Sequence, residues 1–181
     1  MKHVNEDVIR LAAQLGANAI GSTLTAIVFI GDQAMLLHAG DSRAYHIRAG
    51  QACQISTDQT YAQQLVDDGK LDENMAEYRE YSSVLTSFLG TENLRPQIEM
   101  LNLIEGDTLV ICSDGVFDRL STQDIATATL ETLPSLAAEH LVQFGAKRII
   151  DHEQEHGNRH DVESDNMSAV VIRWEKPIQS A

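Results

Sequence analysis

Residues 34–48 read AMLLHAGDSRAYHIR: an apolar run over 34–39, the turn-forming triplet Gly40-Asp41-Ser42, and a second β-type run over 44–48. Glycine and short polar residues between apolar runs mark turns between strands. The same alternation extends to both sides of this stretch. The sequence therefore predicts an antiparallel meander over 22–55.

The other elements follow from apolar periodicity and from turn residues. They are a helix over 5–18, two short helices on either side of Asp68-Gly69, strands over 97–102 and 108–112 joined by a tight hairpin turn at Glu105-Gly106-Asp107, helices over 121–130 and 134–156, and a last strand over 167–174. Strands and helices fall into separate groups. We therefore expect an α+β fold of two packed antiparallel sheets flanked by helices, in a single domain over 1–181.

The charge of the chain argues against two classes of binding partner. The chain has 181 residues, of which 13 are basic and 27 acidic, for a net charge of −14. Such a chain repels phosphate backbones and anionic lipids, so we expect no nucleic-acid and no membrane partner. The first twenty residues hold no continuous apolar run, so we expect no secretion signal and a cytoplasmic location.

Two cysteines, Cys53 and Cys112, are too few for a disulfide scaffold. Each lies in an apolar or strand-like context. We expect a reducing compartment and two buried thiols that behave as small hydrophobic side chains.

Three aspartates stand at the ends of apolar strands. Asp41 follows the run over 34–39, Asp114 follows the run over 108–112, and Asp165 precedes the run over 169–172. Taken singly, each has a plain structural alternative: an Asx-type turn at Asp41, a helix N-cap at Asp114 and a loop acid at Asp165.

Taken together, the three acids predict a metal site. Like charges gathered at one sheet edge are unfavourable unless a cation lies between them. The donors are oxygens, with no Cys or His at ligand spacing. This favours Mg²⁺ or Mn²⁺ over Zn²⁺.

Four ordered motifs carry a family resemblance: GSTLTA over 21–26, AGDSRAY over 39–45, ICSDG over 111–115 and DNMS over 165–168. With these motifs the chain resembles the metal-dependent serine/threonine protein phosphatases of the 2C type, the PPM family, in its bacterial form. The order, spacing and strand context agree over about residues 8–174.

The resemblance implies an α/β/β/α sandwich that hydrolyses phosphoserine or phosphothreonine in proteins with a metal-activated water. By position, Asp114 and Asp165 correspond to ligands of the second metal of a central Mn²⁺ or Mg²⁺ pair, and Asp41 with Asp114 to ligands of a third metal. The acidic stretch over about 58–92 resembles the flap, which influences substrate choice. A phosphorylated protein and a cognate Ser/Thr kinase are the implied partners in signalling.

One departure from the family pattern affects the expected activity. The family's Asp-Gly-x-Gly-Gly segment, whose aspartate bridges two metals, has no counterpart here, because the only Asp-Gly pairs are Asp68-Gly69 and Asp114-Gly115. The early phosphate-binding arginine has no match either, and the substrate-binding residues stay unknown. We expect this chain to be the C-terminal portion of the family domain, incomplete at its N-terminus and poorly active alone. Its exposed sheet edges should favour self-association. The alternative is a catalytically inactive phosphatase-like binding or regulatory module.

A second motif, His152-Glu153-Gln154-Glu155-His156, fits the His-Glu-x-x-His signature of zinc hydrolases. Gly157 follows the second histidine at once, and the surrounding residues are strongly acidic. Both features are typical of a solvated helix end, so a zinc hydrolase is the minor alternative.

Overall fold

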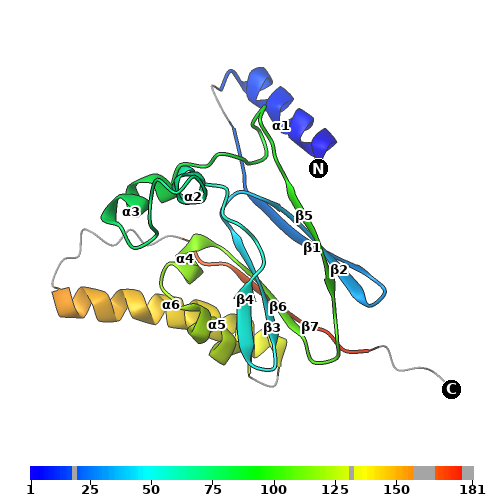
Figure 1. Cartoon of the computed structure of the whole chain (residues 1–181), viewed down its shortest axis with the longest axis vertical. Coiled ribbons are helices and arrows are strands. Elements are labelled where there is room, and N and C mark those ends of the chain that lie inside the picture. Colours follow the sequence, from blue (N-terminus) through cyan, green and yellow to red (C-terminus); the bar gives the residue numbers. More distant parts are fainter. Residues whose placement is uncertain (18–19, 131–132, 157–165, 177–181) are drawn as a thin grey trace. The chain divides into compact units, whose positions relative to one another are not determined.

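The computed structural model describes residues 1–17, 20–130, 133–156 and 166–176 (Figure 1). The chain divides into two compact units. The first holds Met1–Phe29, Ala34–Ser42 and Ser56–Leu101, and the second holds Ile30–Gln33, Arg43–Ile55 and Asn102–Ala181. The single-domain interpretation of 1–181 stays a prediction.

A three-stranded sheet forms the centre of the first unit. Its strands are β1 (Leu24–Ile30), β2 (Gln33–Ala39) and β5 (Gln97–Asn102), in the order β1-β2-β5. Three helices belong to the same unit: α1 (Lys2–Leu15), α2 (Tyr61–Asp67) and α3 (Ala76–Ser82). The predicted N-terminal helix is confirmed, although it begins and ends three residues earlier than expected.

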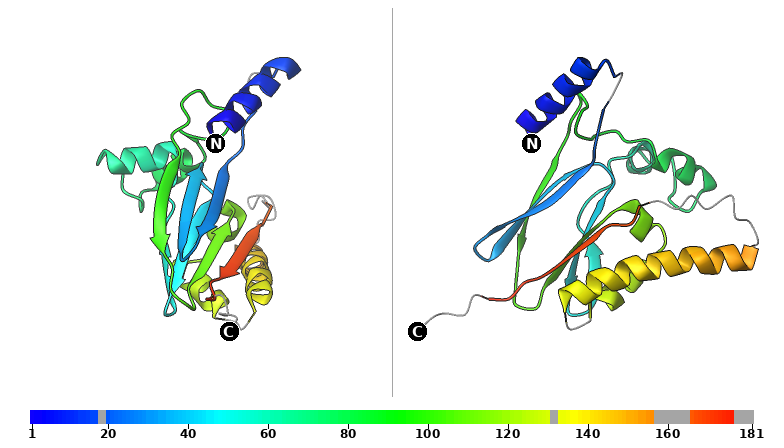
Figure 2. Two further views of the ribbon diagram at one scale, coloured as in Figure 1. Left: turned by 90° about the vertical axis from the view of Figure 1, so that its right-hand side faces the viewer. Right: turned by 180° about the vertical axis from the view of Figure 1, so that it is seen from behind.

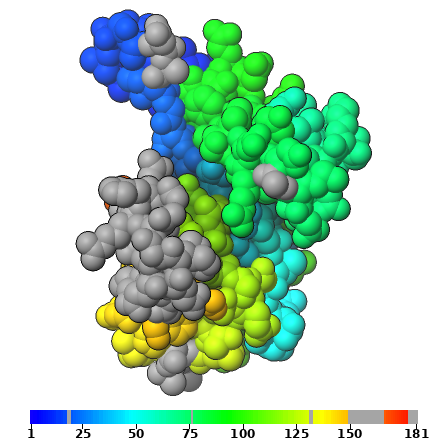
Figure 3. Space-filling model, turned by 90° about the vertical axis from the view of Figure 1, so that its left-hand side faces the viewer, coloured from blue at the N-terminus to red at the C-terminus, as the bar shows by residue number. Residues whose placement is uncertain are grey.

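Helices α2 and α3 confirm the two short helices predicted around Asp68-Gly69. The Thr60 hydroxyl caps α2 by accepting a hydrogen bond from the Gln63 amide at 3.2 Å. The rings of Tyr61 and Tyr81 then meet edge to face, with 5.4 Å between centroids. This segment lies at the molecular surface (Figure 3).

The second unit is built on a four-stranded antiparallel sheet. Its strands are β3 (Arg43–Arg48), β4 (Gln51–Gln54), β6 (Thr108–Cys112) and β7 (Ala169–Arg173), in the order β4-β3-β6-β7. The helices are α4 (Asp114–Phe117), α5 (Thr122–Thr129) and α6 (Pro134–His156).

The core of this unit lies between the sheet and its helices. Tyr45 of β3 pairs with Val110 of β6, which pairs with Val171 of β7. These side chains pack with Ile125 of α5 and Leu141 of α6, both fully buried. Helix α5 contacts β4 and α6 contacts β7, so the two helices cover the sheet (Figures 1 and 2). None of the helices in the described ranges combines the length and the apolarity that a membrane crossing requires.

The predicted strands exist, but two predicted pairings are wrong. Strands β5 and β6 do not form a hairpin, because β5 lies in the three-stranded sheet and β6 lies between β3 and β7. The expected meander over 22–55 is likewise two hairpins in separate sheets, β1-β2 and β3-β4. Turn residues show where a chain reverses, but they do not show which sheet receives the next strand.

The two cysteines differ in environment. Cys112 on the central strand β6 is buried, as expected, whereas Cys53 on the edge strand β4 is exposed. The expectation of two buried thiols is therefore wrong for Cys53, because it alternates with Ala52 and lies on the sheet face opposite to the core of this unit.

Candidate metal site

Asp41 lies in the turn that follows β2, and its side chain is half-buried. The preceding Gly40 has φ 117°, and a Cβ atom placed on it would lie 2.5 Å from Cγ2 of Thr23. Only glycine therefore fits immediately before the aspartate.

Hydrogen bonds hold this turn on both sides of Asp41. On one side, the Gly40 amide donates to Oε1 of Gln59 at 3.1 Å, and the Gln59 amide donates to the Gly40 carbonyl at 2.8 Å. On the other side, the hydroxyls of Thr23 and Ser42 lie 3.0 Å apart, and the Thr25 hydroxyl lies 3.0 Å from the Ser42 carbonyl. The GSTLTA and AGDSRAY motifs are thus parts of one hydrogen-bonded unit.

Asp114 is the first residue of α4, directly after β6, and its carboxylate accepts a hydrogen bond from the Gly115 amide at 2.9 Å. Ser113 occupies the N-cap position of this helix. The simple alternative for Asp114, a helix N-cap, is therefore wrong. The side chain is half-buried beside a buried strand end.

The ICSDG and DNMS motifs also contact each other. The Ser113 hydroxyl donates to the Asn166 carbonyl at 3.1 Å and accepts from the Ser168 amide at 3.1 Å. A Cβ atom on Gly115 would lie 2.7 Å from the Asn166 carbonyl oxygen, so glycine permits this close approach.

The structure describes two of the three predicted metal ligands. Asp41 belongs to the first unit and Asp114 to the second. Asp165 lies outside the described residues. Within the described part of the chain, no group of three or more His, Cys, Asp and Glu residues is arranged to hold a metal ion. The joint site of the three aspartates stays a prediction.

Residues 152–156 form the C-terminal end of α6, as the sequence predicted for a helix end. Their side chains lie outside the described residues. The zinc-hydrolase alternative through His152 and His156 is therefore unchanged as a hypothesis.

The sequence reasoning assigned no role to His38, which is fully buried between Thr25 and Thr57. Burial lowers the pKa of His38, although the Thr57 carbonyl and the Asp58 carboxylate act in the opposite direction. The sequence does contain an indication of this role, because a histidine in an apolar strand requires buried polar partners, and His38 lies three residues before a candidate ligand.

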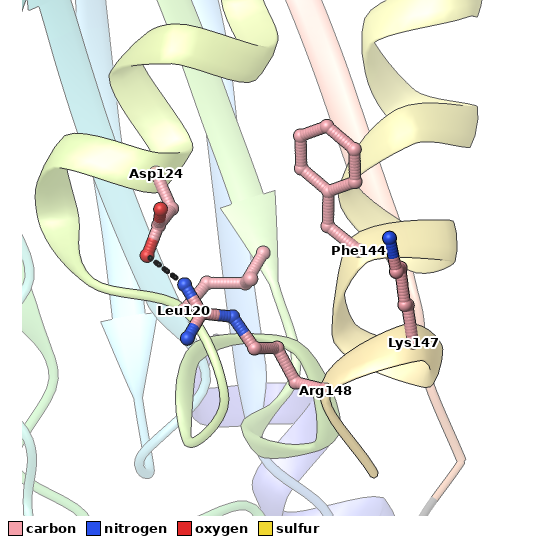
Figure 4. Close-up of a pocket in the computed structure, with 5 residues that line it drawn as sticks. All are labelled: Leu120, Asp124, Phe144, Lys147 and Arg148. Carbon is pink, nitrogen blue, oxygen red and sulfur yellow. Dashed lines mark ion pairs between the residues drawn. The ribbon is translucent and has the colours of Figure 1, made fainter. Parts of the chain in front are cut away.

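A small pocket of about 230 Å³ lies beside α5 and α6 in the second unit. It is lined by Leu120, Asp124, Phe144, Lys147 and Arg148 (Figure 4). Arg148 lies 3.7 Å from Asp124, whose carboxylate also accepts hydrogen bonds from Ser121 and so completes a capping box at the start of α5. This pocket contains none of the predicted metal ligands.

Comparison with known proteins identifies the family. The profile of the family described as protein phosphatase 2C matches residues 2–150. The serine/threonine protein phosphatase PstP of Mycobacterium tuberculosis is 34% identical over 128 residues, which are 71% of this chain and 25% of PstP.

Solved structures agree with this assignment. PppA, a regulatory component of the type VI secretion system of Pseudomonas aeruginosa, is 30% identical with a TM-score of 0.76, over 94% of this chain and 65% of that one. The PstP catalytic domain in complex with two manganese ions is 27% identical with a TM-score of 0.72, over 92% of this chain and 64% of that one. The α+β fold with two antiparallel sheets is that of these phosphatases, and the chain belongs to the protein phosphatase 2C family.

Proposed function

We propose that this chain contributes to a Mn²⁺- or Mg²⁺-dependent hydrolysis of phosphoserine and phosphothreonine in proteins, with Asp41, Asp114 and Asp165 as metal ligands. One observation carries the proposal: the family match extends over residues 2–150 and includes both described aspartates. The cytoplasm, a phosphorylated protein substrate, signalling and a cognate Ser/Thr kinase belong to the same proposal.

The donor chemistry around Asp114 fits a hard divalent cation. Its half-buried carboxylate offers oxygen, which Mg²⁺ and Mn²⁺ prefer. The nearby sulfur does not compete, because the Cys112 side chain is buried in the hydrophobic core of its unit. Arg43 stacks over the Phe117 ring at 4.0 Å from its centroid, which ties β3 to the helix that begins at Asp114.

When bound, a pair of such ions supplies an activated water and neutralises the phosphoryl oxygens. The residues of this chain would orient the ligands. Gly40 and Ser42 are held by hydrogen bonds on either side of Asp41. Ser113 joins the strand end before Asp114 to Asn166 and Ser168.

The alternative, a phosphatase-like module that binds a partner without turnover, is favoured by one specific observation. Residues 1–181 contain no Asp-Gly-x-Gly-Gly sequence. A metal pair needs a bridging ligand to keep the ions roughly 3.5–4 Å apart. We therefore expect this chain alone to be a poor catalyst, and a version that carries such a segment to be active.

The test compares both versions, each as wild type and as Asp114→Ala, in hydrolysis of a phosphothreonine peptide and of p-nitrophenyl phosphate with Mn²⁺ titrated. The proposal predicts turnover that depends on Mn²⁺ in the longer version and a loss of at least about a hundredfold on Asp114→Ala. If the longer version binds Mn²⁺ but hydrolyses neither substrate, the binding-module alternative holds. If residues 1–181 alone match the longer version, another acid of this chain replaces the bridging aspartate.

A further inference from the structure

His38 occupies a junction in the first unit. Its ring is fully buried on β2, three residues before Asp41. Nδ1 lies 2.9 Å from the Thr25 hydroxyl of β1, and Nε2 lies 3.1 Å from the Thr57 carbonyl. The ring therefore joins β2 to two segments that are distant from it in sequence.

Both of these segments lead to the turn that carries Asp41. Two residues after Thr57, Gln59 makes two hydrogen bonds with Gly40, one through its side chain and one through its backbone amide. The Thr25 hydroxyl lies 3.0 Å from the Ser42 carbonyl. One partner of the imidazole, Thr25, therefore bonds the turn directly, and the other, Thr57, lies two residues from Gln59, which bonds the turn on its other side.

The two hydrogen bonds of the His38 ring require one ring nitrogen to donate and the other to accept, as in a neutral imidazole. The Thr57 carbonyl only accepts, so Nε2 must carry the ring proton to bond it. Nδ1 is then an acceptor, and the Thr25 hydroxyl proton is shared between Nδ1 and the Ser42 carbonyl. The opposite tautomer would place the Nε2 lone pair against the Thr57 oxygen in a fully buried site, which is unfavourable.

We propose that His38 is a positioning residue for Asp41: it fixes the Gly40-Asp41-Ser42 turn through Thr57 and Gln59 on one side and through Thr25 on the other. The inference rests on the proposed role of Asp41 as a metal ligand. Partners that orient a ligand typically change metal affinity by tenfold or more when removed.

The competing explanation is that His38 only packs the core of its unit. Leu36 supplies the matched control, because it is fully buried on the same strand and the same face, two residues from His38, and has no polar contact to lose. Leu36→Ala destabilises the core without touching the hydrogen bonds of the turn.

The test measures Mn²⁺ affinity by electron paramagnetic resonance and amide hydrogen exchange at Asp41 and Ser42, in the wild type and in His38→Leu, Thr25→Val, Thr25→Ser, Leu36→Ala and Asp41→Asn. We expect His38→Leu and Thr25→Val to weaken Mn²⁺ binding by about tenfold and to accelerate exchange at the turn. Thr25→Ser keeps the hydroxyl and should match the wild type. Leu36→Ala should lower the Tm and leave Mn²⁺ affinity unchanged.

Two results would overturn the inference: unchanged Mn²⁺ affinity in folded His38→Leu or Thr25→Val while Asp41→Asn weakens binding, or equal effects of Leu36→Ala and His38→Leu on affinity and exchange. If His38→Leu does not fold, Thr25→Val carries the test, because it removes one hydroxyl only. If Asp41→Asn leaves Mn²⁺ affinity unchanged, the proposed ligand role fails instead. Exchange at the turn then decides whether His38 still positions it.

Discussion

The Arg48 guanidinium binds the Asp107 carboxylate through two hydrogen bonds, Nε to Oδ1 at 2.9 Å and Nη2 to Oδ2 at 2.7 Å. Asp107 is almost fully buried, and its carboxylate also accepts from the Ile104 amide at 2.9 Å, while Nε2 of His46 lies 3.1 Å away. This pairing fixes the segment before β6 against β3. The residues around Gly106 still form a tight turn, in which the Asp107 amide donates to the Ile104 carbonyl at 3.1 Å, but the turn joins strands of two different sheets and not a hairpin.

The stability of the second unit should fall in acid because of Asp107. Burial raises the pKa of this group, but the hydrogen bonds from Arg48 and Ile104, together with the nearby His46 ring, outweigh it and lower the pKa to about 2. A lowered pKa stabilises the fold above the unfolded value near 4, and this contribution of about 2 kcal/mol disappears as the pH falls from about 4 to 2.

Urea unfolding at pH 7, 4 and 2 checks this expectation. Asp107→Asn should be less stable than the wild type at pH 7, and the difference should shrink between pH 4 and 2. If the difference in unfolding free energy between the wild type and Asp107→Asn stays constant from pH 4 to 2, Asp107 is not the cause of the loss of stability in acid.

Gly40→Ala should be among the most damaging single substitutions in the first unit. The residue has φ 117°, and a Cβ atom would lie 2.5 Å from Thr23. Backbone strain of about 1–2 kcal/mol then adds to an overpacking cost of about 1–3 kcal/mol. Gly31 is the control, because it also has a positive φ but nothing lies within 4 Å of an added Cβ atom.

Thermal and urea unfolding of the two variants separate strain from crowding. Gly31→Ala should lose only the conformational part, about 1 kcal/mol. A loss in Gly40→Ala no larger than in Gly31→Ala would contradict the close approach of Thr23 to this turn.

Local signals in the sequence predicted the elements well. Apolar runs bounded by glycine identified β2, β3 and β6, and the helix predicted over 121–130 is α5, which begins with a capping box at Ser121. Sheet membership was not predictable in this way, because β5 and β6 have the same turn residues between them whether or not they pair. Long-range hydrogen bonding decides that question.

The candidate metal site was likewise predictable only in its local features. Asp41 and Asp114 were identified from their places at strand ends, and the structure confirms those places. The partners of the Asp41 turn were missed, because Thr25, Thr57 and Gln59 come from other segments and acquire their roles only through folding. Cys53 was misjudged because a four-residue strand does not show which of its two faces packs on the core.

The two thiols should differ in reactivity. Cys53 is exposed, whereas burial raises the pKa of Cys112 to about 12. Because the thiolate is the reactive form, Cys112 should resist modification until the chain unfolds. Titration with a thiol-specific reagent at pH 8 should count one thiol in the native protein and two in urea. Cys53→Ser should leave none reactive in the native protein, and rapid labelling of that variant would contradict the burial of Cys112.

The edges of the three-stranded sheet should promote self-association. Strands β1 and β5 are its edge strands, and each exposes large apolar side chains. Val28 and Ile30 on β1 are 40% and 53% exposed, and Ile98 and Met100 on β5 are 61% and 47% exposed. In each pair the residues are two apart, so they share one face of the strand. Unpaired strand edges with apolar side chains pair readily with other chains.

Sedimentation velocity over a hundredfold range of concentration tests the role of these edges. The wild type should show concentration-dependent association, and the double substitution Ile98→Lys with Met100→Lys should weaken it by about tenfold or more, because a charged edge opposes strand pairing. Val170→Lys is the control, since Val170 is 53% exposed on β7, an edge strand of the other sheet. If Val170→Lys abolishes association and the β5 variant does not, the four-stranded sheet provides the interface. If the wild type stays monomeric at every concentration, the edges of the three-stranded sheet do not mediate self-association.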